Sequence, residues 1–174
     1  MRTALAEAVL LSPPDPAWPS QAATLLAELT ALLGGADIRG EHIGSTAVAG
    51  LSAKPVLDLM IGVPSLAHIE RHHDALKGRG WRYRPEHEAR LPQRRYFVRD
   101  ASGDWPRVHL HALVQGGALW LAHLRFRDAL RASPALRDEY ARLKQRLAVA
   151  FAGDKAAYTE AKAPFIQQVL RVEG

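Results

Sequence analysis

One carboxylate lies at the centre of an otherwise apolar segment. Residues 55–63 alternate so that Leu57 and Leu59 share one face of an expected strand, while Asp58 and Met60 share the other. A buried carboxylate without a partner costs several kcal/mol, so Asp58 requires a ligand, a metal ion or a neighbouring cation. A functional role and a simple ion pair with Lys54 or an arginine are equally consistent with this pattern.

A turn of small residues precedes that segment. Gly44 allows the backbone to approach a ligand closely, and Ser45 with the amides that follow it is suited to holding a phosphate. His42 is a candidate phosphate donor or general acid–base residue, or else a hydrogen-bonded histidine at a strand end. Glu41 points away from His42 and is left out of the candidate site.

Two histidines repeat on one face of another expected strand. Within residues 107–114, His109 and His111 point to the same side, about 7 Å apart. That spacing lets two imidazoles share a metal ion or an anionic ligand, although such a pair on its own is more often structural. The remaining histidines show no convergent pattern and are expected at the surface: His68, His72, His73, His87 and His123.

Basic residues accompany these candidates. Lys54 directly precedes the Asp58 strand and either meets a phosphate or neutralises the carboxylate. Arg94, Arg95 and Arg107 come from an arginine-rich stretch and would form an anion-binding wall if they faced one cleft. A solvated hairpin face explains the same arginines and is the simpler interpretation.

The order of elements predicts an α+β fold. Apolar alternation and flanking glycine or proline predict strands at residues 9–11, 38–43, 55–63, 81–83, 94–98 and 107–114. Helical spacing predicts helices at 20–33, 65–77, 118–132 and 134–151, and a last one from 154 that kinks or restarts at Pro164. We expect one domain over residues 1–174. It would combine a twisted mixed sheet of about four to six strands within residues 9–115, helices on one face, and a tail of three helices at 118–172.

Composition limits the class of protein. The chain has 174 residues, 48% of them hydrophobic, which suffices for one domain with a real core, and the absence of cysteine excludes disulfides and thiol chemistry. No apolar run approaches the roughly 18 residues of a membrane span, and the charged start is unlike a signal peptide, so a cytoplasmic protein without membrane contact is expected. The net charge of +5 suggests nucleic acid, but the basic residues are neither clustered nor interleaved with aromatics, which argues against that partner.

The pairing of Gly44-Ser45 with Asp58 resembles the nucleotidyltransferase superfamily that includes DNA polymerase beta. In that superfamily the Gly-Ser turn holds the nucleotide phosphates, two carboxylates of one strand bind magnesium, and a third comes from a neighbouring strand. Asp58 matches the first carboxylate, but Met60 stands in the place of the second. Because a thioether is a poor ligand for magnesium, Met60 counts against the two-magnesium mechanism.

A more specific resemblance spans residues 9–170. The segment from His42 to Val48, followed by Gly50-Leu51, Lys54-Pro55 and Asp58, is similar to the hallmark of the GrpB family, with Ala49 where that family usually has proline. Other segments fit the same family: Asp15-Pro16-Ala17-Trp18-Pro19, His109-Leu110-His111, Phe126-Arg127-Asp128 with Leu130, Tyr140 with Lys144, and Tyr158-Thr159 with Lys162. GrpB proteins are poorly characterised bacterial proteins assigned to the nucleotidyltransferase fold, and their domain also occurs fused to dephospho-coenzyme A kinase.

The resemblance implies a polymerase-beta-like nucleotidyltransferase fold and a nucleotide or phosphorylated small molecule as ligand. It places the His109 strand beside the Asp58 strand, so that Asp58, His109 and His111 would hold a divalent ion (Mg, Mn or Zn), with Asp58 and His42 as catalytic residues. Phosphate binding would fall to Gly44, Ser45, Thr46, Lys54 and Arg95.

Three functions stay open at this point. The first is a nucleotidyltransferase, or a phosphoryl-group enzyme derived from one. The second is a non-catalytic domain that binds a ligand or regulates a protein partner, linked to coenzyme A metabolism. The third is a nucleic-acid-binding accessory, whose affinity would fall steeply with salt concentration. Met60 is the discriminating feature, because it counts against ordinary transfer with two magnesium ions and leaves room for either a different metal or no catalysis.

Overall fold

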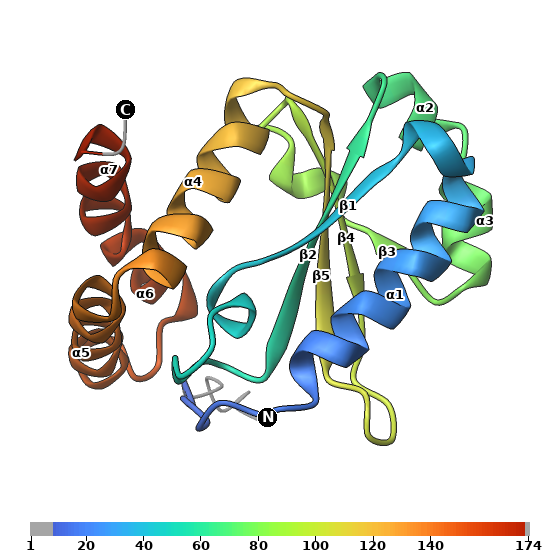
Figure 1. The fold of residues 1–174 in the computed structure, drawn as a ribbon. Helices are drawn as coiled ribbons and strands as arrows, with labels where there is room; N and C mark the ends of the chain where they lie inside the picture. Colours follow the sequence, from blue (N-terminus) through green and yellow to red (C-terminus); the bar gives the residue numbers. More distant parts are fainter. Residues whose placement is uncertain (1–8, 173–174) are drawn as a thin grey trace.

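A five-stranded mixed sheet forms the centre of the molecule, and the computed structural model describes residues 9–172 (Figure 1). The strand order is β1-β2-β5-β4-β3, in which only β2 and β5 run parallel. The bounds are β1 (Arg39–Ile43), β2 (Val56–Val63), β3 (Arg82–Tyr83), β4 (Arg94–Arg99) and β5 (Arg107–Val114). The expected α+β class with a mixed sheet is confirmed.

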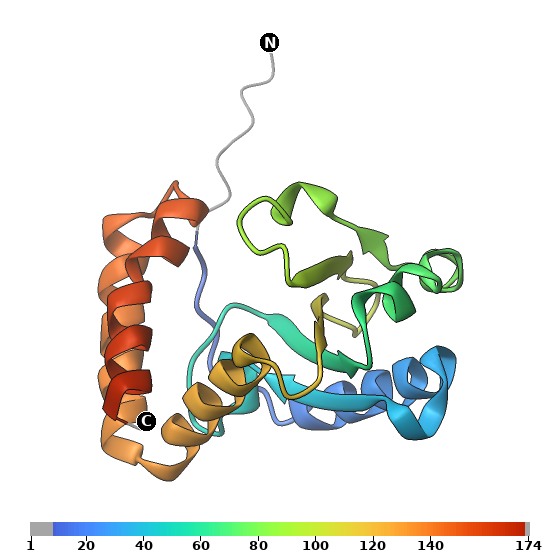
Figure 2. The same cartoon turned by 90° about the horizontal axis from the view of Figure 1, so that it is seen from above.

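Helices cover both faces of this sheet. One face packs against α1 (Trp18–Leu33), α2 (Leu66–Glu70) and α3 (His73–Gly78), and the main apolar core lies between these layers. The other face packs against α4 (Ala118–Ala132), and the chain continues into α5 (Pro134–Ala150), α6 (Lys155–Ala161) and α7 (Ala163–Val172), which lie together on that side (Figure 2). The expectation of helices on one face, with three more beside the sheet, was therefore wrong: the tail has four helices, and α4 covers the second face.

The alternation in β2 explains why both faces are covered. Leu57, Leu59 and Ile61 are fully buried toward α1, as their apolar character predicts. Met60 on the opposite face is also fully buried, in a cluster with Trp120 of α4. Asp58, two residues earlier, lies beyond that cluster and keeps 31% of its side chain exposed. Strand β2 therefore presents its carboxylate at the edge of the region that α4 covers.

Side chains cap the first turns of two helices in the tail. Ser133 Oγ accepts a hydrogen bond from the Leu136 amide at 3.2 Å, and Asp154 Oδ1 accepts one from the Ala157 amide at 2.9 Å. The tail also restarts where proline predicts it, because Pro164 lies in the first turn of α7, where a missing amide donor costs little. Three short 3₁₀ helices, η1 (Gly35–Asp37), η2 (Ser45–Ala47) and η3 (Pro85–His87), lie in the loops.

Two sequence predictions fail locally. Residues 9–11 form no strand, and only Ser12 makes an isolated bridge, to Ala53, because Pro13 and Pro14 cannot continue a ladder. The helix expected at 65–77 is two helices, since His72 Nδ1 bonds the His68 carbonyl that an unbroken helix would offer to the His72 amide. Across the described residues, no helix combines the length and apolar content that a membrane crossing requires.

Candidate functional site

Asp58 and the two histidines meet across the parallel strands. In the register of β2 and β5, Asp58 pairs with His109 and Met60 pairs with His111. His111 Nε2 lies 3.1 Å from Asp58 Oδ1, and His109 Nδ1 lies 3.7 Å from the same oxygen. The sequence-based expectation that these three side chains converge agrees with this geometry. The carboxylate thus faces two imidazoles on one side.

The charges around Asp58 favour its ionised form. Burial by itself would raise the pKa of Asp58, but the hydrogen bond with His111 and the charges of His111, His109 and Lys162 lower it to about 2. Burial lowers the pKa of His109 to about 4, although Asp58 opposes that shift. At neutral pH the site therefore holds a carboxylate beside a neutral His109 imidazole.

Gly44 brings the backbone against the carboxylate. A Cβ at this position would lie 2.7 Å from Asp58 Oδ2, and the residue has a φ of +73°. Both features exclude a side chain, because the contact is far inside van der Waals distance and L-residues rarely adopt that φ. The Gly44-Ser45 turn and Asp58 are therefore one structural unit.

Replacing Gly44 by alanine is expected to displace this turn. The strained φ and the clash with Asp58 should lower the free energy of unfolding by about 1–3 kcal/mol. Chemical denaturation monitored by tryptophan fluorescence measures the loss. Gly78→Ala is the control, because a Cβ there meets nothing within 4 Å and its φ lies outside the left-handed region. Equal stabilities for the two variants would contradict the assigned role of Gly44.

Three lysines converge from the tail and from the start of β2. Lys144 of α5 is 2% exposed, and its Nζ donates hydrogen bonds to Ser45 Oγ, at 3.0 Å, and to the Ser52 carbonyl. Lys54 and Lys162 both lie over the ring of Tyr158, with Nζ 5.3 Å and 4.6 Å from its centroid. The sequence analysis placed Lys54 here but gave Lys144 no role beyond family resemblance.

The electrostatics of these lysines indicate an excess of positive charge. Burial, together with repulsion from Lys162 and Lys54, lowers the pKa of Lys144 to about 7. Burial and repulsion from Lys54 lower the pKa of Lys162 to about 8, against the attraction of Asp58. The pKa of Lys54 is lowered as well, first by burial. An anion placed among the three ammonium groups would relieve both the desolvation and the repulsion.

A second group of side chains closes the far side of the site. Arg94 of β4 has its Nη1 3.3 Å from His111 Nδ1 and its guanidinium 4.7 Å from the ring centroid of Tyr96. His123 of α4 lies with its ring centroid 5.6 Å from that of His111, and burial lowers its pKa to about 4. The expectation that His123 lies at the surface was wrong. His123 follows the buried Trp120 by three residues, so both lie on one face of α4, and this spacing could have predicted the burial of His123.

His42 does not face Asp58 directly. It pairs with Leu59 in the β1–β2 register, so its side chain lies on the α1 face, where Nε2 is 2.9 Å from Thr46 Oγ1. Burial lowers the pKa of His42 to about 4, and Thr46 is 5% exposed. His42 and Thr46, both predicted as site residues, are thus hydrogen-bonded to each other on the α1 face of the sheet, away from Asp58.

Glu41, omitted from the candidate site, is the β1 residue on the Asp58 face, because it pairs with Met60. Its Oε2 accepts a hydrogen bond at 2.7 Å from Arg127 Nη1 of α4, and the same nitrogen donates to the His42 carbonyl. Glu41 therefore docks α4 onto the edge of the sheet.

Arg95 is not part of this site. It pairs with Ala112 on the α2 side of the sheet, and its guanidinium bridges Glu70 at 2.8 Å and Glu88 at 3.5 Å. Its neighbour Arg94, one residue earlier, is the arginine that points to His111. The prediction that Arg95 binds phosphate therefore selected the wrong face of β4.

Arg107 lies at the start of β5. Its Nε is 3.4 Å from His109 Nε2, and its Nη1 contacts Asp100 at 3.2 Å. It is the member of the arginine-rich stretch that borders the site on the side of Lys54.

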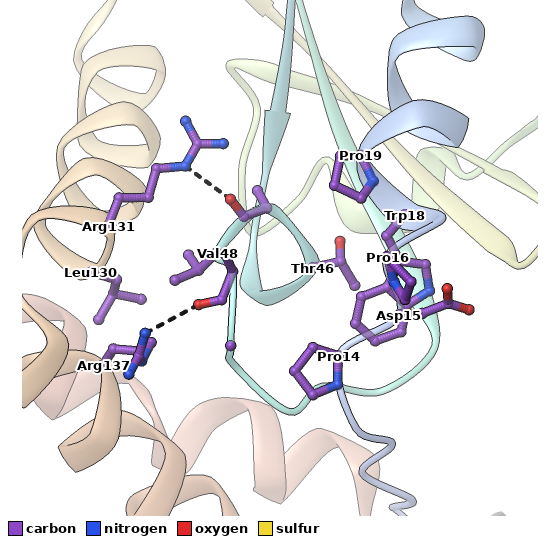
Figure 3. A pocket seen from close by; sticks show the side chains of 13 residues that line it. Pro14, Asp15, Pro16, Trp18, Pro19, Thr46, Val48, Leu130, Arg131 and Arg137 are labelled. Atoms are coloured by element: carbon purple, nitrogen blue, oxygen red, sulfur yellow. Dashed lines mark hydrogen bonds between the residues drawn. The ribbon is translucent and has the colours of Figure 1, made fainter.

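Two arginines of the helical tail hold the segment that follows the Gly44-Ser45 turn. Arg131 Nε donates to the Ala47 carbonyl at 2.9 Å, and Arg137 Nη1 donates to the Ala49 carbonyl at 3.4 Å (Figure 3). A pocket of about 610 Å³ lies on the outer side of this segment, between it and the prolines that precede α1 (Figure 3). The tail therefore holds the turn in place as well as supplying Lys144.

Met60 is a core residue. It is fully buried against Ile43, Leu113 and Trp120, so the place of a second strand carboxylate is occupied by apolar packing. Within residues 9–172, no group of three or more His, Cys, Asp or Glu side chains is arranged to hold a metal ion. The donors present around Asp58 are one carboxylate and imidazole nitrogens, which do not fit the two-magnesium centre.

Comparison with known proteins identifies the family. A family model described as GrpB protein matches residues 8–172. The chain belongs to the GrpB family. The glutamate-rich protein GrpB of Alkalihalophilus pseudofirmus is 32% identical over 133 residues, covering 75% of each chain. The protein YqkA of Bacillus subtilis is 36% identical over 126 residues, but this chain spans only 36% of its length.

Solved structures agree with this assignment. The crystal structure of GrpB from Enterococcus faecalis superposes with a TM-score of 0.81 at 29% identity, covering 94% of this chain and 96% of that one. This GrpB chain therefore has the fold of that protein. A comparison with the Cid1 poly(U) polymerase bound to MgATP gives a TM-score of 0.45 at 14% identity over 76% of this chain and 45% of that one, and nothing is concluded from it.

Proposed function

We propose that this GrpB chain binds a nucleotide or another phosphorylated small molecule between the Gly44-Ser45 turn, Asp58 and the tail. The convergence of Lys54, Lys144 and Lys162 carries the proposal, because three partly desolvated ammonium groups lie close enough to repel one another and only Lys54 and Lys162 are attracted by Asp58. Charge-assisted hydrogen bonds to phosphate oxygens are the interactions that such groups make best. The ligand would bind with its phosphates near Ser45, where Lys144 already donates a hydrogen bond.

A divalent ion is part of the proposal through Asp58. Magnesium commonly binds proteins through one or two carboxylates together with the phosphates of the ligand, so Asp58 would hold it with the bound phosphate. His109 and His111 would add no ligands, because among the described residues no three such side chains are arranged to hold a metal ion. Bound there, the ion would neutralise phosphate charge.

A binding role without catalysis is the second candidate, and the burial of Met60 favours it. Nucleotidyl transfer by two metal ions needs a second carboxylate on this strand, and an apolar cluster fills that place. A relative named dephospho-CoA kinase, from Mycolicibacterium paratuberculosis, is 32% identical over 188 residues, and this chain spans 45% of it. We propose on this basis that the ligand or the protein partner belongs to coenzyme A metabolism.

The lysine cluster is tested by calorimetric titration with tripolyphosphate and with ATP at pH 7. Lys162→Met removes one charge next to Asp58 and is expected to weaken the binding of both ligands about tenfold, the effect of one charge-assisted contact. Lys77→Met is the matched control, because Lys77 is exposed on α3, on the opposite side of the sheet. It should leave both affinities unchanged.

The same titration with magnesium, manganese or zinc tests the ion at Asp58, and an assay of pyrophosphate release separates the two candidates. If Asp58 holds the ion, added metal strengthens ATP binding to the wild type and has no effect on Asp58→Asn. Release of pyrophosphate on incubation with ATP and metal would establish transfer. Wild-type protein that binds neither tripolyphosphate nor ATP, or a Lys162→Met variant that binds both as tightly as wild type, would refute the proposed function.

A further inference from the structure

A second hollow of about 750 Å³ adjoins the lysine site. It lies at the end of the sheet where β2 and β5 begin, between the start of α1, the β4–β5 turn and the start of α6. Its size is in the range of small-molecule sites. Its lining includes Lys54, Trp105 and Arg107.

Trp105 gives this pocket a fixed apolar wall. Its amide and carbonyl pair with those of Ser102 in an isolated bridge, with both hydrogen bonds 3.0 Å long, which closes the β4–β5 turn. Gln21 of α1 reaches across and donates from Nε2 to the Asp104 carbonyl at 2.9 Å. The Trp105 side chain is partly exposed and packs against the main core. An aromatic surface fixed in this way loses little conformational entropy when a ligand stacks on it.

The cations at the pocket connect it to the site at Asp58. Lys54 lines the pocket and also belongs to the lysine cluster, where it lies over Tyr158 and interacts electrostatically with Asp58. Arg107 lines the pocket as well, and its Nε lies 3.4 Å from His109. A ligand with its phosphates at the lysines that extends past Lys54 therefore reaches Trp105.

We infer that this pocket binds the aromatic ring of the ligand, a nucleobase stacked on Trp105, while its phosphates occupy the lysine cluster. The inference rests on the proposed function, since it assigns the rest of the same ligand. It also names the substrate class: a nucleoside polyphosphate, and not a bare phosphate or a phosphorylated aliphatic compound. Every nucleobase has an aromatic face that can stack on a tryptophan ring, so the pocket should accept purines and pyrimidines.

The test compares ATP and CTP with tripolyphosphate, which has the phosphates but no ring. In calorimetric titrations at pH 7, Trp105→Ala is expected to weaken ATP and CTP binding about fivefold to a hundredfold, the range measured for losing one stacked base. Tripolyphosphate should bind this variant as it binds wild type, which shows at the same time that the variant is folded. Trp105→Phe keeps a ring and should recover most of the lost affinity for both nucleotides.

The outcomes separate this inference from the proposed function. If wild type binds tripolyphosphate as tightly as ATP, and Trp105→Ala changes neither, the lysine site stands and the ring pocket is refuted. If Trp105→Ala weakens all three ligands equally, Trp105 supports the fold of the site and stacks on no ring, which also refutes the inference. If wild type binds none of the ligands, the proposed function itself has failed.

Discussion

Met60→Asp is expected to lower the free energy of unfolding by about 3–5 kcal/mol and to create no second metal ligand. Met60 is fully buried with Ile43, Leu113 and Trp120, which carry no charge to offset a carboxylate. Its neighbour on β5, His111, already bonds Asp58. An aspartate there would also lie on the same face as Asp58 and opposite Glu41 in the β1 register, so three acidic groups would crowd one surface. Desolvation and repulsion would both destabilise an ionised aspartate at position 60 in the folded protein.

Urea denaturation with and without magnesium measures this effect. Met60→Leu is the control, because a volume-conserving apolar exchange usually costs less than about 1.5 kcal/mol. Equal stabilities of Met60→Asp and Met60→Leu would contradict the packing role of Met60. Recovery of the stability of Met60→Asp in magnesium would also contradict that role, since it would mean that this position can still bind the ion.

The same residue illustrates how far the sequence could predict the site. Alternation within β2 correctly predicted a buried Leu57 and Leu59 face, with Asp58 on the other side. The resemblance to the nucleotidyltransferase superfamily identified Met60 as a departure from the pattern of that superfamily. The reason for that departure is tertiary: Met60 is covered by Trp120 of α4, which is distant in sequence. Local periodicity describes the faces of a strand and leaves open what packs against each face.

The errors in the candidate site have one physical origin. Alternation predicts that Glu41 and His42 point in opposite directions, and likewise Arg94 and Arg95. Which of each pair faces Asp58 depends on the register with the neighbouring strand, set by long-range hydrogen bonds. His42 and Arg95 were predicted as site residues, but the register places their side chains on the face opposite Asp58.

The residues that were missed come from the helical tail. Lys144 and His123 lie on helices, and nothing in their local sequence indicates that α4 and α5 fold back over the Gly44-Ser45 turn. The buried stripe of α4 was the one usable sign for His123. Docking of the tail depends on side-chain bonds such as Arg131 to the Ala47 carbonyl, which join residues 84 positions apart.

Binding of tripolyphosphate should weaken about a hundredfold between pH 6.5 and pH 9. The pKa values of Lys144 and Lys162, about 7 and about 8, lie inside this window, so both ammonium groups lose their protons across it. Each lost charge-assisted contact costs roughly tenfold in affinity. At pH 8 binding should therefore take up protons, because phosphate favours the protonated lysines. Calorimetry in buffers of different ionisation enthalpy measures this uptake directly.

Stability and affinity should change in opposite directions across this window. In the unfolded chain a lysine keeps its proton to a pKa of about 10.4, so the unfolded state binds more protons than the folded one above about pH 7. The ligand-free protein should therefore become more stable as the pH rises toward 10, and unfolding cannot explain the weaker binding. Lys144→Met should bind tripolyphosphate at least tenfold more weakly than wild type at pH 6.5, with a shallower dependence on pH. An unchanged pH profile in Lys144→Met would show that phosphate does not bind at the lysine cluster, and that the excess of positive charge there has another cause.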